Sequence, residues 1–290
     1  IQPIEEIKNV LKDHPLVKFH VDMVQALGKI KIDLKGIDCA SFSAHKINGL
    51  KGSGLLFKRK STTLVPLING GQQEFGLRGG TSNACTYIVL AKTLRLALEN
   101  FDQKEKYVSK LNKYLIKELQ TIPDKIAKIL EDKERIQWFA SKQANAHDVF
   151  FVGRGIDYAI CMEGSLKMKE ISYIHSEAYA AGELKHGTIS LIEDDILVVG
   201  VLTQPDLYEK TISNMVECRS RGAYLMGLTT FGQYNIEDST DFAVYIPKID
   251  PHFATSLAVI PLQLLGYYIS VAKGLDVDKP RNLAKSVTVE

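Results

Sequence analysis

The chain has 290 residues, of which 45% are apolar and 24% are charged, and its net charge is +2. This balance is that of a globular protein with enough chain for about two domains, and it gives no argument for nucleic-acid binding or for a membrane surface. No uninterrupted apolar run approaches the ~18 residues of a membrane span. The four cysteines are scattered without metal-ligand spacing, so we predict a cytoplasmic protein with no metal site.

The first 120 residues alternate short apolar runs with helical periods. The pattern predicts a helix over residues 4–11, strands over 17–24, 39–43 and 54–57, and one or two amphipathic helices over 90–119. Strands that alternate with helices indicate an α/β layered fold, here with a parallel sheet whose edges are unpaired. We therefore expect this half of the chain to be the less stable one.

Three motifs in this half carry chemistry: HVDMVQALGK at residues 20–29, SFSAHKINGLKGSG at 41–54 and GGQQEFGLRGGTSN at 70–83. Any one of them alone would carry a high risk of a false match. Together they resemble the large domain of cysteine desulfurases, which are pyridoxal-phosphate enzymes of the class V aminotransferase group. The resemblance covers roughly residues 1–118 and implies a fragment of the fold-type-I large domain over residues 1–120.

The resemblance implies a role for each of six residues. Lys46 would be the Schiff-base lysine, Asp22 would pair with the protonated pyridine nitrogen, and Gln25 would hydrogen-bond the phenolic oxygen. Ser43 and His45 would reach the phosphate, and Thr81 would reach the phosphate of a neighbouring subunit's cofactor. A carboxylate, a hydroxyl and an amine then converge on one small dianion.

The same resemblance is incomplete. Neither Cys39 nor Cys85 lies in the context of the persulfide-forming cysteine, and Leu50 stands where the family usually has proline. We therefore expect no desulfurase activity.

From about residue 121 the pattern is that of repeated βαβ units. Strands are predicted over residues 148–152, 196–202, 223–228 and 242–246, with helices over 156–174, 207–221 and 255–273. This alternation indicates a parallel sheet with helices on both faces. A helix is also predicted to run through the junction near residues 119–123, since no Gly- or Ser-rich linker separates the two halves.

Within the predicted helix over 156–174, Glu163, Lys167 and Glu170 share one stripe, while apolar residues occupy most of the remaining circumference. By spacing alone this is a solvated stripe with a Glu-to-Lys pair at i,i+4. The surrounding sequence, EGSLKMKEISYIHSEAYAAGELKHG at 163–187, resembles the isomerase domain of glutamine–fructose-6-phosphate aminotransferases (glucosamine-6-phosphate synthases). The resemblance covers residues 121–290 and includes GRG at 153–155 and the ending LDVDKPRNLAKSVTVE.

This second resemblance implies a sugar isomerase (SIS) subdomain with an α/β/α sandwich and five site residues. Glu170 would move a proton between C1 and C2, and Glu163 and Lys167 would orient that base and the sugar. His186 would assist ring opening and would come from the partner subunit of a homodimer. Lys285 would capture the open-chain ketone as a Schiff base.

The whole chain therefore resembles a chimera of two enzyme fragments. We expect its main function to be the isomerisation of fructose 6-phosphate to glucosamine 6-phosphate, impaired because the first isomerase subdomain and the glutaminase domain are missing. No cofactor is expected in the isomerase half. The alternatives are a pyridoxal-phosphate protein of desulfurase type, with the cofactor at Lys46, and a non-catalytic module for sugar-phosphate binding or dimerisation.

Overall fold

The computed structural model describes residues 2–232 and 235–281 of the chain. The chain divides into two units, Ile1–Tyr114 and Leu115–Glu290. The division lies inside a single helix, α3 (Phe101–Glu131), a few residues before the position near 120 that the sequence predicted. The chain thus passes from one unit to the other along helical backbone.

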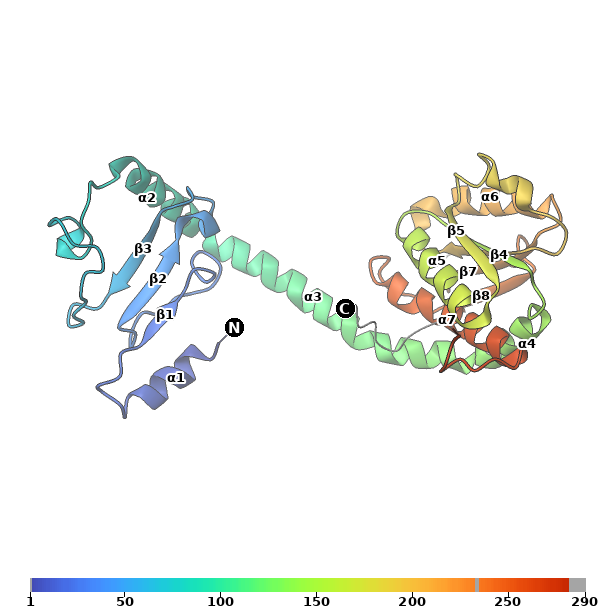
Figure 1. Cartoon of the computed structure of the whole chain (residues 1–290), viewed down its shortest axis with the longest axis horizontal. Helices are drawn as coiled ribbons and strands as arrows, with labels where there is room; N and C mark the ends of the chain where they lie inside the picture. Colours follow the sequence, from blue (N-terminus) through green and yellow to red (C-terminus); the bar gives the residue numbers. More distant parts are fainter. Residues whose placement is uncertain (1, 233–234, 282–290) are drawn as a thin grey trace. The chain divides into compact units, whose positions relative to one another are not determined.

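The first unit is built on a three-stranded sheet in the order β1-β2-β3 (Figure 1). β1 (His20–Asp22) runs parallel to β2 (Cys39–Ser43), and β3 (Gly54–Lys58) runs antiparallel to β2. The prediction of a parallel sheet is therefore wrong for β3. The connection from β2 to β3 is too short for a parallel crossover, which needs about a dozen residues or more, so the chain folds back on itself.

Alternation along β1 and β2 gives this small sheet one apolar and one polar face. Val21, Ala40 and Phe42 are buried together with Met23 and Ile37 in an apolar cluster. Two helices accompany the sheet, α1 (Ile4–Leu11) and α2 (Ala84–Glu99). The predicted helix at 4–11 and strand at 39–43 are confirmed, and the helical region at 90–119 comprises α2 and α3.

The second unit is a five-stranded parallel sheet in the order β5-β4-β6-β7-β8. Its strands are β4 (Asp148–Gly153), β5 (His175–Ala180), β6 (Leu197–Leu202), β7 (Tyr224–Thr230) and β8 (Phe242–Ile246). Its helices, after the end of α3, are α4 (Lys133–Lys142), α5 (Ile156–Lys167), α6 (Tyr208–Arg219) and α7 (Ala254–Ala272). The predicted parallel sheet with helices on both faces is confirmed.

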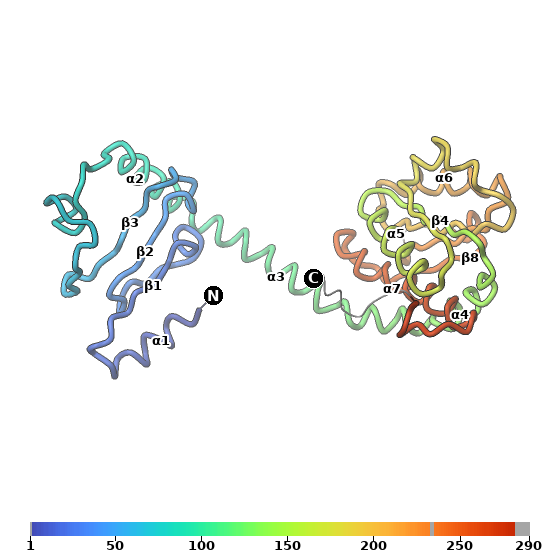
Figure 2. Tube along the Cα trace, in the orientation of Figure 1, coloured from blue at the N-terminus to red at the C-terminus, as the bar shows by residue number. Residues whose placement is uncertain are grey.

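Each face of this sheet has its own apolar core. Phe151 and Val199 pack in a core that includes α4, α5 and α7, whereas Phe150 and Val198 pack on the opposite face with α6. In the trace of the second unit, α6 lies on the other side of the strands from α4 and α7 (Figure 2). Central strands that are covered on both faces are apolar at successive positions, which is why β4 and β6 are readable as unbroken apolar runs.

Two parts of this unit differ from the sequence prediction. The helix expected over residues 156–174 ends at Lys167 and continues as a π-helical turn, Met168–Ser172. β5 was not predicted at all, because its sequence HSEAYA carries polar side chains on both faces. α5 is also not buried all round, since Met162 and Leu166 are 47% and 51% exposed.

Helix α7 is long and apolar enough to cross a membrane, but half of its most apolar stretch is buried inside the protein. Leu257, Leu262, Leu265 and Ile269 are fully buried in the same core as β4 and β6. An apolar helix of this kind is the core helix of a folded domain.

The GRG turn joins β4 to α5 by close backbone contacts. Gly155 has a φ of 58°, and a Cβ on Gly153 would lie 2.8 Å from the carbonyl carbon of Asp157. The Asp157 carboxylate is 2% exposed and accepts hydrogen bonds from the backbone N–H groups of Thr203 (2.8 Å) and Gln204 (3.3 Å) and from the Thr203 hydroxyl. These bonds fasten the end of β6 to the start of α5. Burial nevertheless raises the pKa of Asp157 to about 6.

We expect hydrogen exchange to be faster at the amides of β1, β2 and β3 than at those of β4, β6 and β7. The apolar cores of the first unit are small, whereas the second unit has an extensive core on each face of its sheet. Exchange measured peptide by peptide on the intact chain checks this. Equal protection in the two units would contradict it.

We expect Asp157 to make the second unit more stable as the pH falls from 7.5 to 5. Its pKa rises from 3.8 in an exposed carboxyl to about 6 in the folded protein, so the folded state takes up the proton first and the stabilisation is lost as pH rises through 6. The gain at pH 5 is about 1 kcal/mol. Denaturation followed by Trp138, the single tryptophan of the chain, should show this gain in the protein and not in Asp157→Asn. An equal pH response in both proteins would contradict the assignment.

Candidate functional site

The charged stripe of α5 forms an ion pair different from the one that spacing suggested. Lys167 Nζ lies 2.6 Å from Glu170 Oε2, at i,i+3, and both side chains are about one-third exposed. The hydrogen bond to Glu170 raises the pKa of Lys167, and the charge of Glu163 adds to the effect. Lys167 therefore stays cationic and fixes the Glu170 carboxylate where solvent or a ligand can reach it.

Glu170 owes its position to the π-helical turn. Met168 and Ser172 are fully buried on the inner side of this turn, and the Ser172 hydroxyl donates to the Met168 carbonyl at 2.6 Å. Tyr173 follows with a φ of 59°, which ends the turn in the left-handed region. A π-helical turn inserts one residue into the helical ladder, and such turns occur frequently at functional sites.

The same chain does not bring Glu170 and His186 together. Glu170 lies between the end of α5 and the first residue of β5, at the amino-terminal edge of the sheet. His186 is exposed and comes six positions after Ala180, the last residue of β5, in the loop that leaves the opposite edge. The six residues of β5 span about 20 Å. A site that used both groups would take them from different copies of the chain.

Lys285, predicted to capture the open-chain ketone, lies outside the described residues 2–232 and 235–281. At its end, the described chain nevertheless approaches the turn that carries Glu170. The backbone N–H of Arg281 donates to the Tyr173 hydroxyl at 2.8 Å, and Tyr173 is three positions after Glu170.

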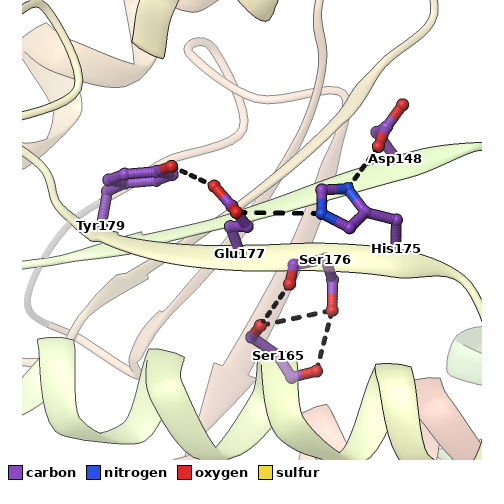
Figure 3. Close-up of polar contacts among 6 residues, drawn as sticks. All are labelled: Asp148, Ser165, His175, Ser176, Glu177 and Tyr179. Atoms are coloured by element: carbon purple, nitrogen blue, oxygen red, sulfur yellow. Dashed lines mark hydrogen bonds and ion pairs between the residues drawn. The ribbon is translucent and has the colours of Figure 1, made fainter.

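A polar chain along β5 was not found by the sequence analysis (Figure 3). His175 Nδ1 lies 2.6 Å from Asp148 Oδ1, His175 Nε2 lies 3.8 Å from Glu177 Oε1, and the Tyr179 hydroxyl donates to Glu177. The hydrogen bond to Glu177 raises the pKa of Tyr179. The spacing of His175, Glu177 and Tyr179 at every second residue was the available signal, because it places all three on one face of a strand.

The opposite face of β5 is fastened to α5 by two buried serines. The Ser165 hydroxyl donates to the Ser176 carbonyl at 2.9 Å, and the Ser176 hydroxyl donates to the Ser165 carbonyl at 2.8 Å. Figure 3 shows this pair between helix and strand, on the side away from Glu177. The bonds hold α5 against β5, and the turn that carries Glu170 joins these two elements.

The first unit gathers most of its predicted cofactor residues at one edge of its sheet. Asp22 is the last residue of β1 and Ser43 is the last residue of the parallel strand β2, and their side chains lie on the polar face. His45 and Lys46 follow in the short 3-10 helix Ala44–Ile47 and are exposed. The carboxylate, hydroxyl, imidazole and amine therefore share one accessible edge.

The other two predicted cofactor residues are less closely gathered. Gln25 is exposed and accepts a hydrogen bond from Lys29 Nζ at 2.7 Å. Thr81 is exposed in the loop before α2. The structure also adds a pair that the sequence analysis missed: His20 Nε2 lies 2.6 Å from Ser41 Oγ, on the polar face that carries Asp22.

Comparisons with known proteins assign the two parts of the chain to two different families. Residues 1–160 match the family "Aminotransferase class-V", and residues 143–273 match "SIS domain". The two matches overlap over 143–160, where the strand pairing of β4 with β5 and β6 assigns the segment to the sheet of the second unit.

Curated relatives match the second part of the chain. Glutamine–fructose-6-phosphate aminotransferases [isomerizing] from Caldanaerobacter subterraneus and Clostridium tetani are 55% and 56% identical over 176 and 184 residues, or 61% and 62% of this chain. The matched part is 29% and 30% of their own length.

A solved structure gives the same assignment. The C-terminal domain of glucosamine-fructose-6-phosphate aminotransferase from Francisella tularensis is 32% identical with a TM-score of 0.52, and the match covers 67% of this chain and 52% of that one. The class-V aminotransferase model matches more than half of the sequence, so the chain belongs to the aminotransferase class-V family. Its second part is a SIS domain similar to that of the glutamine–fructose-6-phosphate aminotransferases.

Proposed function

We propose that the second unit carries out the ketose-to-aldose isomerisation of glucosamine 6-phosphate synthesis, with fructose 6-phosphate as the sugar that enters. The observation that carries the proposal is the pairing of Lys167 with Glu170 at 2.6 Å on an accessible turn of the SIS domain. The relatives named for this reaction support it, although the chain matches less than a third of their length.

Glu170 is the base of this reaction. Its carboxylate takes the proton from C1 of the open-chain sugar and returns it to C2, a transfer that a single carboxylate can perform on one face of the substrate. The Lys167 ammonium restricts the rotation of that carboxylate and adds a positive charge near C1 and C2 of the sugar, where negative charge develops as the C1 proton leaves. Glu163, one turn earlier on α5, supports the orientation of Lys167.

His186 and Lys285 complete the proposed site. The length of β5 separates Glu170 from His186 within one chain, so His186 of a second copy opens the sugar ring in a homodimer. The Lys285 amine adds to the ketone carbon that ring opening exposes, and the ketone oxygen leaves as water. Ammonia that then displaces the lysine from this carbon supplies the nitrogen of the product.

We expect Glu170→Gln to lower the exchange of the C1 proton of fructose 6-phosphate with solvent deuterium by about 10²-fold or more, because the amide cannot accept that proton. Exchange observed by NMR detects this step even when net turnover is slow. The matched control is Glu193→Gln, which removes an exposed carboxylate at the amino-terminal side of β6 and should leave the rate unchanged.

Two outcomes would contradict this role. Exchange that persists in Glu170→Gln would exclude Glu170 as the base. Thermal stabilisation by fructose 6-phosphate that is equal in the two proteins, without exchange in either, would favour a non-catalytic sugar-phosphate module. A mixture of Glu170→Gln and His186→Ala chains that regains activity lost in each alone would support the sharing of the site between subunits.

We also infer that the first unit binds pyridoxal phosphate, because the parallel pairing of β1 with β2 places Asp22, Ser43 and Lys46 at one edge. The donor set fits the group: a carboxylate suits its ring nitrogen, and a hydroxyl and an imidazole suit its phosphate. When bound, the group supplies an electron sink. Asp22 holds the proton on the ring nitrogen, Ser43 and His45 bind the phosphate, and the Lys46 amine holds the aldehyde carbon.

The remaining contacts are more peripheral. Gln25 would exchange its bond to Lys29 for one to the phenolic oxygen, and Thr81 would reach the phosphate held by a neighbouring subunit. We do not expect desulfurase chemistry from these residues, since they bind and orient without a cysteine nucleophile among them.

We expect Lys46→Ala to abolish borohydride-fixed labelling of the chain by pyridoxal phosphate at low micromolar cofactor, because the amine that forms the covalent link is removed. Peptide mapping by mass spectrometry locates the label. Lys51→Ala, at an exposed lysine of the same loop, is the matched control and should label like the unaltered chain. Label spread evenly over surface lysines would contradict a specific site.

A further inference from the structure

The hydroxyl of Ser172 makes two hydrogen bonds at the point where the π-helical turn ends. It donates to the Met168 carbonyl at 2.6 Å and accepts from the Ile174 backbone N–H at 3.3 Å. Ser172 is 0% exposed, so both bonds are shielded from water. One buried side chain therefore joins the first residue of the turn to the residue that leads into β5.

The bond to Met168 replaces one that the backbone does not make in a π-helical turn. In an α-helix the backbone N–H of Ser172 would donate to the carbonyl four residues back, which is that of Met168. In a π-helical turn each N–H donates to the carbonyl five residues back. The Ser172 hydroxyl supplies a donor to the Met168 carbonyl from the same residue, so it favours the π-helical form. Without the hydroxyl the Ile174 N–H would also lose its buried acceptor, which costs free energy.

Packing against α7 holds the apolar side of the turn. A Cβ on Gly266 would lie 3.6 Å from Ile171 Cδ1 and 3.8 Å from the Met168 backbone nitrogen, so the two helical segments approach closely there. The end of the turn is held differently. Tyr173 has a φ of 59°, a conformation that persists only where its surroundings enforce it, and the two bonds of Ser172 lie on either side of it.

The proposed base lies between the two backbone groups that Ser172 joins. Glu170 follows Met168 and precedes Ile174, and its carboxylate lies 2.6 Å from Nζ of Lys167, the last residue of α5. The angle between two side chains about a helix axis depends on the number of residues per turn, which differs between α- and π-helical backbone. The direction of the Glu170 carboxylate relative to Lys167 therefore depends on the form of this turn.

We propose that Ser172 is a positioning residue of the isomerase site: its hydroxyl holds the π-helical turn in the form that pairs Glu170 with Lys167. The catalytic consequence rests on the proposed function, whereas the hydroxyl bonds and the ion pair do not depend on any sugar chemistry. Ser172 is fully buried and acts through Glu170, without contact to the sugar itself.

The first test measures the ion pair without sugar. We expect Lys167 of the full chain to react with trace acetic anhydride about threefold faster in Ser172→Ala, because an ammonium released from its carboxylate loses its proton more readily. Mass spectrometry measures the modification of each lysine, and Lys169, which is exposed on the same turn, is the internal reference. Ser172→Thr keeps the hydroxyl and should restore the slow reaction.

The matched control is Ser270→Ala on α7. Ser270 is also 0% exposed, and its hydroxyl donates to the Gly266 carbonyl at 2.8 Å, four residues back in a regular helix. This substitution removes a buried bond of the same kind outside the turn, so Lys167 should react as in the unaltered chain. If Ser172→Ala does not fold, Ser172→Cys keeps a side chain of similar size with a weaker donor and should show part of the increase.

The second test measures the consequence for the sugar. Exchange of the C1 proton of fructose 6-phosphate, followed by NMR at several sugar concentrations, should have a maximal rate about tenfold lower in Ser172→Ala, with an unchanged half-saturating concentration. Ser172→Thr should regain most of that rate. A merely structural Ser172 would lower the midpoint of thermal unfolding, followed by Trp138, and leave the maximal rate of the folded protein unchanged.

The outcomes separate the two proposals. Lys167 that reacts equally fast in Ser172→Ala and in the unaltered chain overturns the positioning role, and so does an equal increase in Ser270→Ala. A maximal exchange rate that Ser172→Ala leaves unchanged overturns it as well. A faster reaction of Lys167 in Ser172→Ala that Ser172→Thr reverses supports the role even if the unaltered chain does not exchange the C1 proton, and that last result overturns the proposed isomerase chemistry instead.

Discussion

The return of the chain from β4 through α5 to β5 is the constraint on which the second unit depends. Because β4 and β5 are parallel, α5 must run from the carboxyl edge of the sheet back to the amino edge before β5 can begin. The residues at the end of α5 and those after β5 are then separated by the whole length of a strand. The topology thus places Glu170 and the start of the loop that carries His186 at opposite edges of the sheet.

The same topology explains why Arg281, the last residue that the structure describes, reaches Tyr173. α7 follows β8 at the carboxyl edge and packs on the face of the sheet that α4 and α5 also cover. Its buried apolar residues fix it against the core, and Gly266 lies against Ile171 of the π-helical turn. In the first unit, the parallel pairing of β1 with β2 brings the carboxyl ends of both strands to one edge of the sheet. Asp22 and Ser43 lie at these ends.

Apolar periodicity was enough to predict much of the fold. The helix at 4–11 and the strands at 39–43 and 242–246 have the predicted bounds, because alternation or an unbroken apolar run marks each of them. β5 was missed because an edge strand with His175, Glu177 and Tyr179 on one face and Ser176 on the other has no apolar face to detect. The predicted helix over 156–174 was too long, since helical periodicity does not reveal the extra residue of a π-helical turn.

The site was less predictable than the fold. The stripe of Glu163, Lys167 and Glu170 follows from helical spacing, but the choice of Lys167–Glu170 as the ion pair depends on where α5 ends. The contact of Tyr173 with Arg281 joins residues 108 positions apart, and nothing in the periodicity of either segment points to the other. The roles assigned to Lys46, His186 and Lys285 came from family resemblance, because a single exposed lysine or histidine has no distinguishing spacing.

The antiparallel strand β3 has a consequence for handling the protein. It is the outer strand of its sheet, and Leu55 and Leu56 on it are exposed, the latter by 51%. An open strand with exposed leucines is a template for intermolecular β-pairing, and the charges of Lys58 and Arg59 oppose that pairing only at one end. Concentrated solutions of the chain should therefore form aggregates that begin at this strand, and a charged residue in place of Leu56, which pairs with Ser41, should improve solubility.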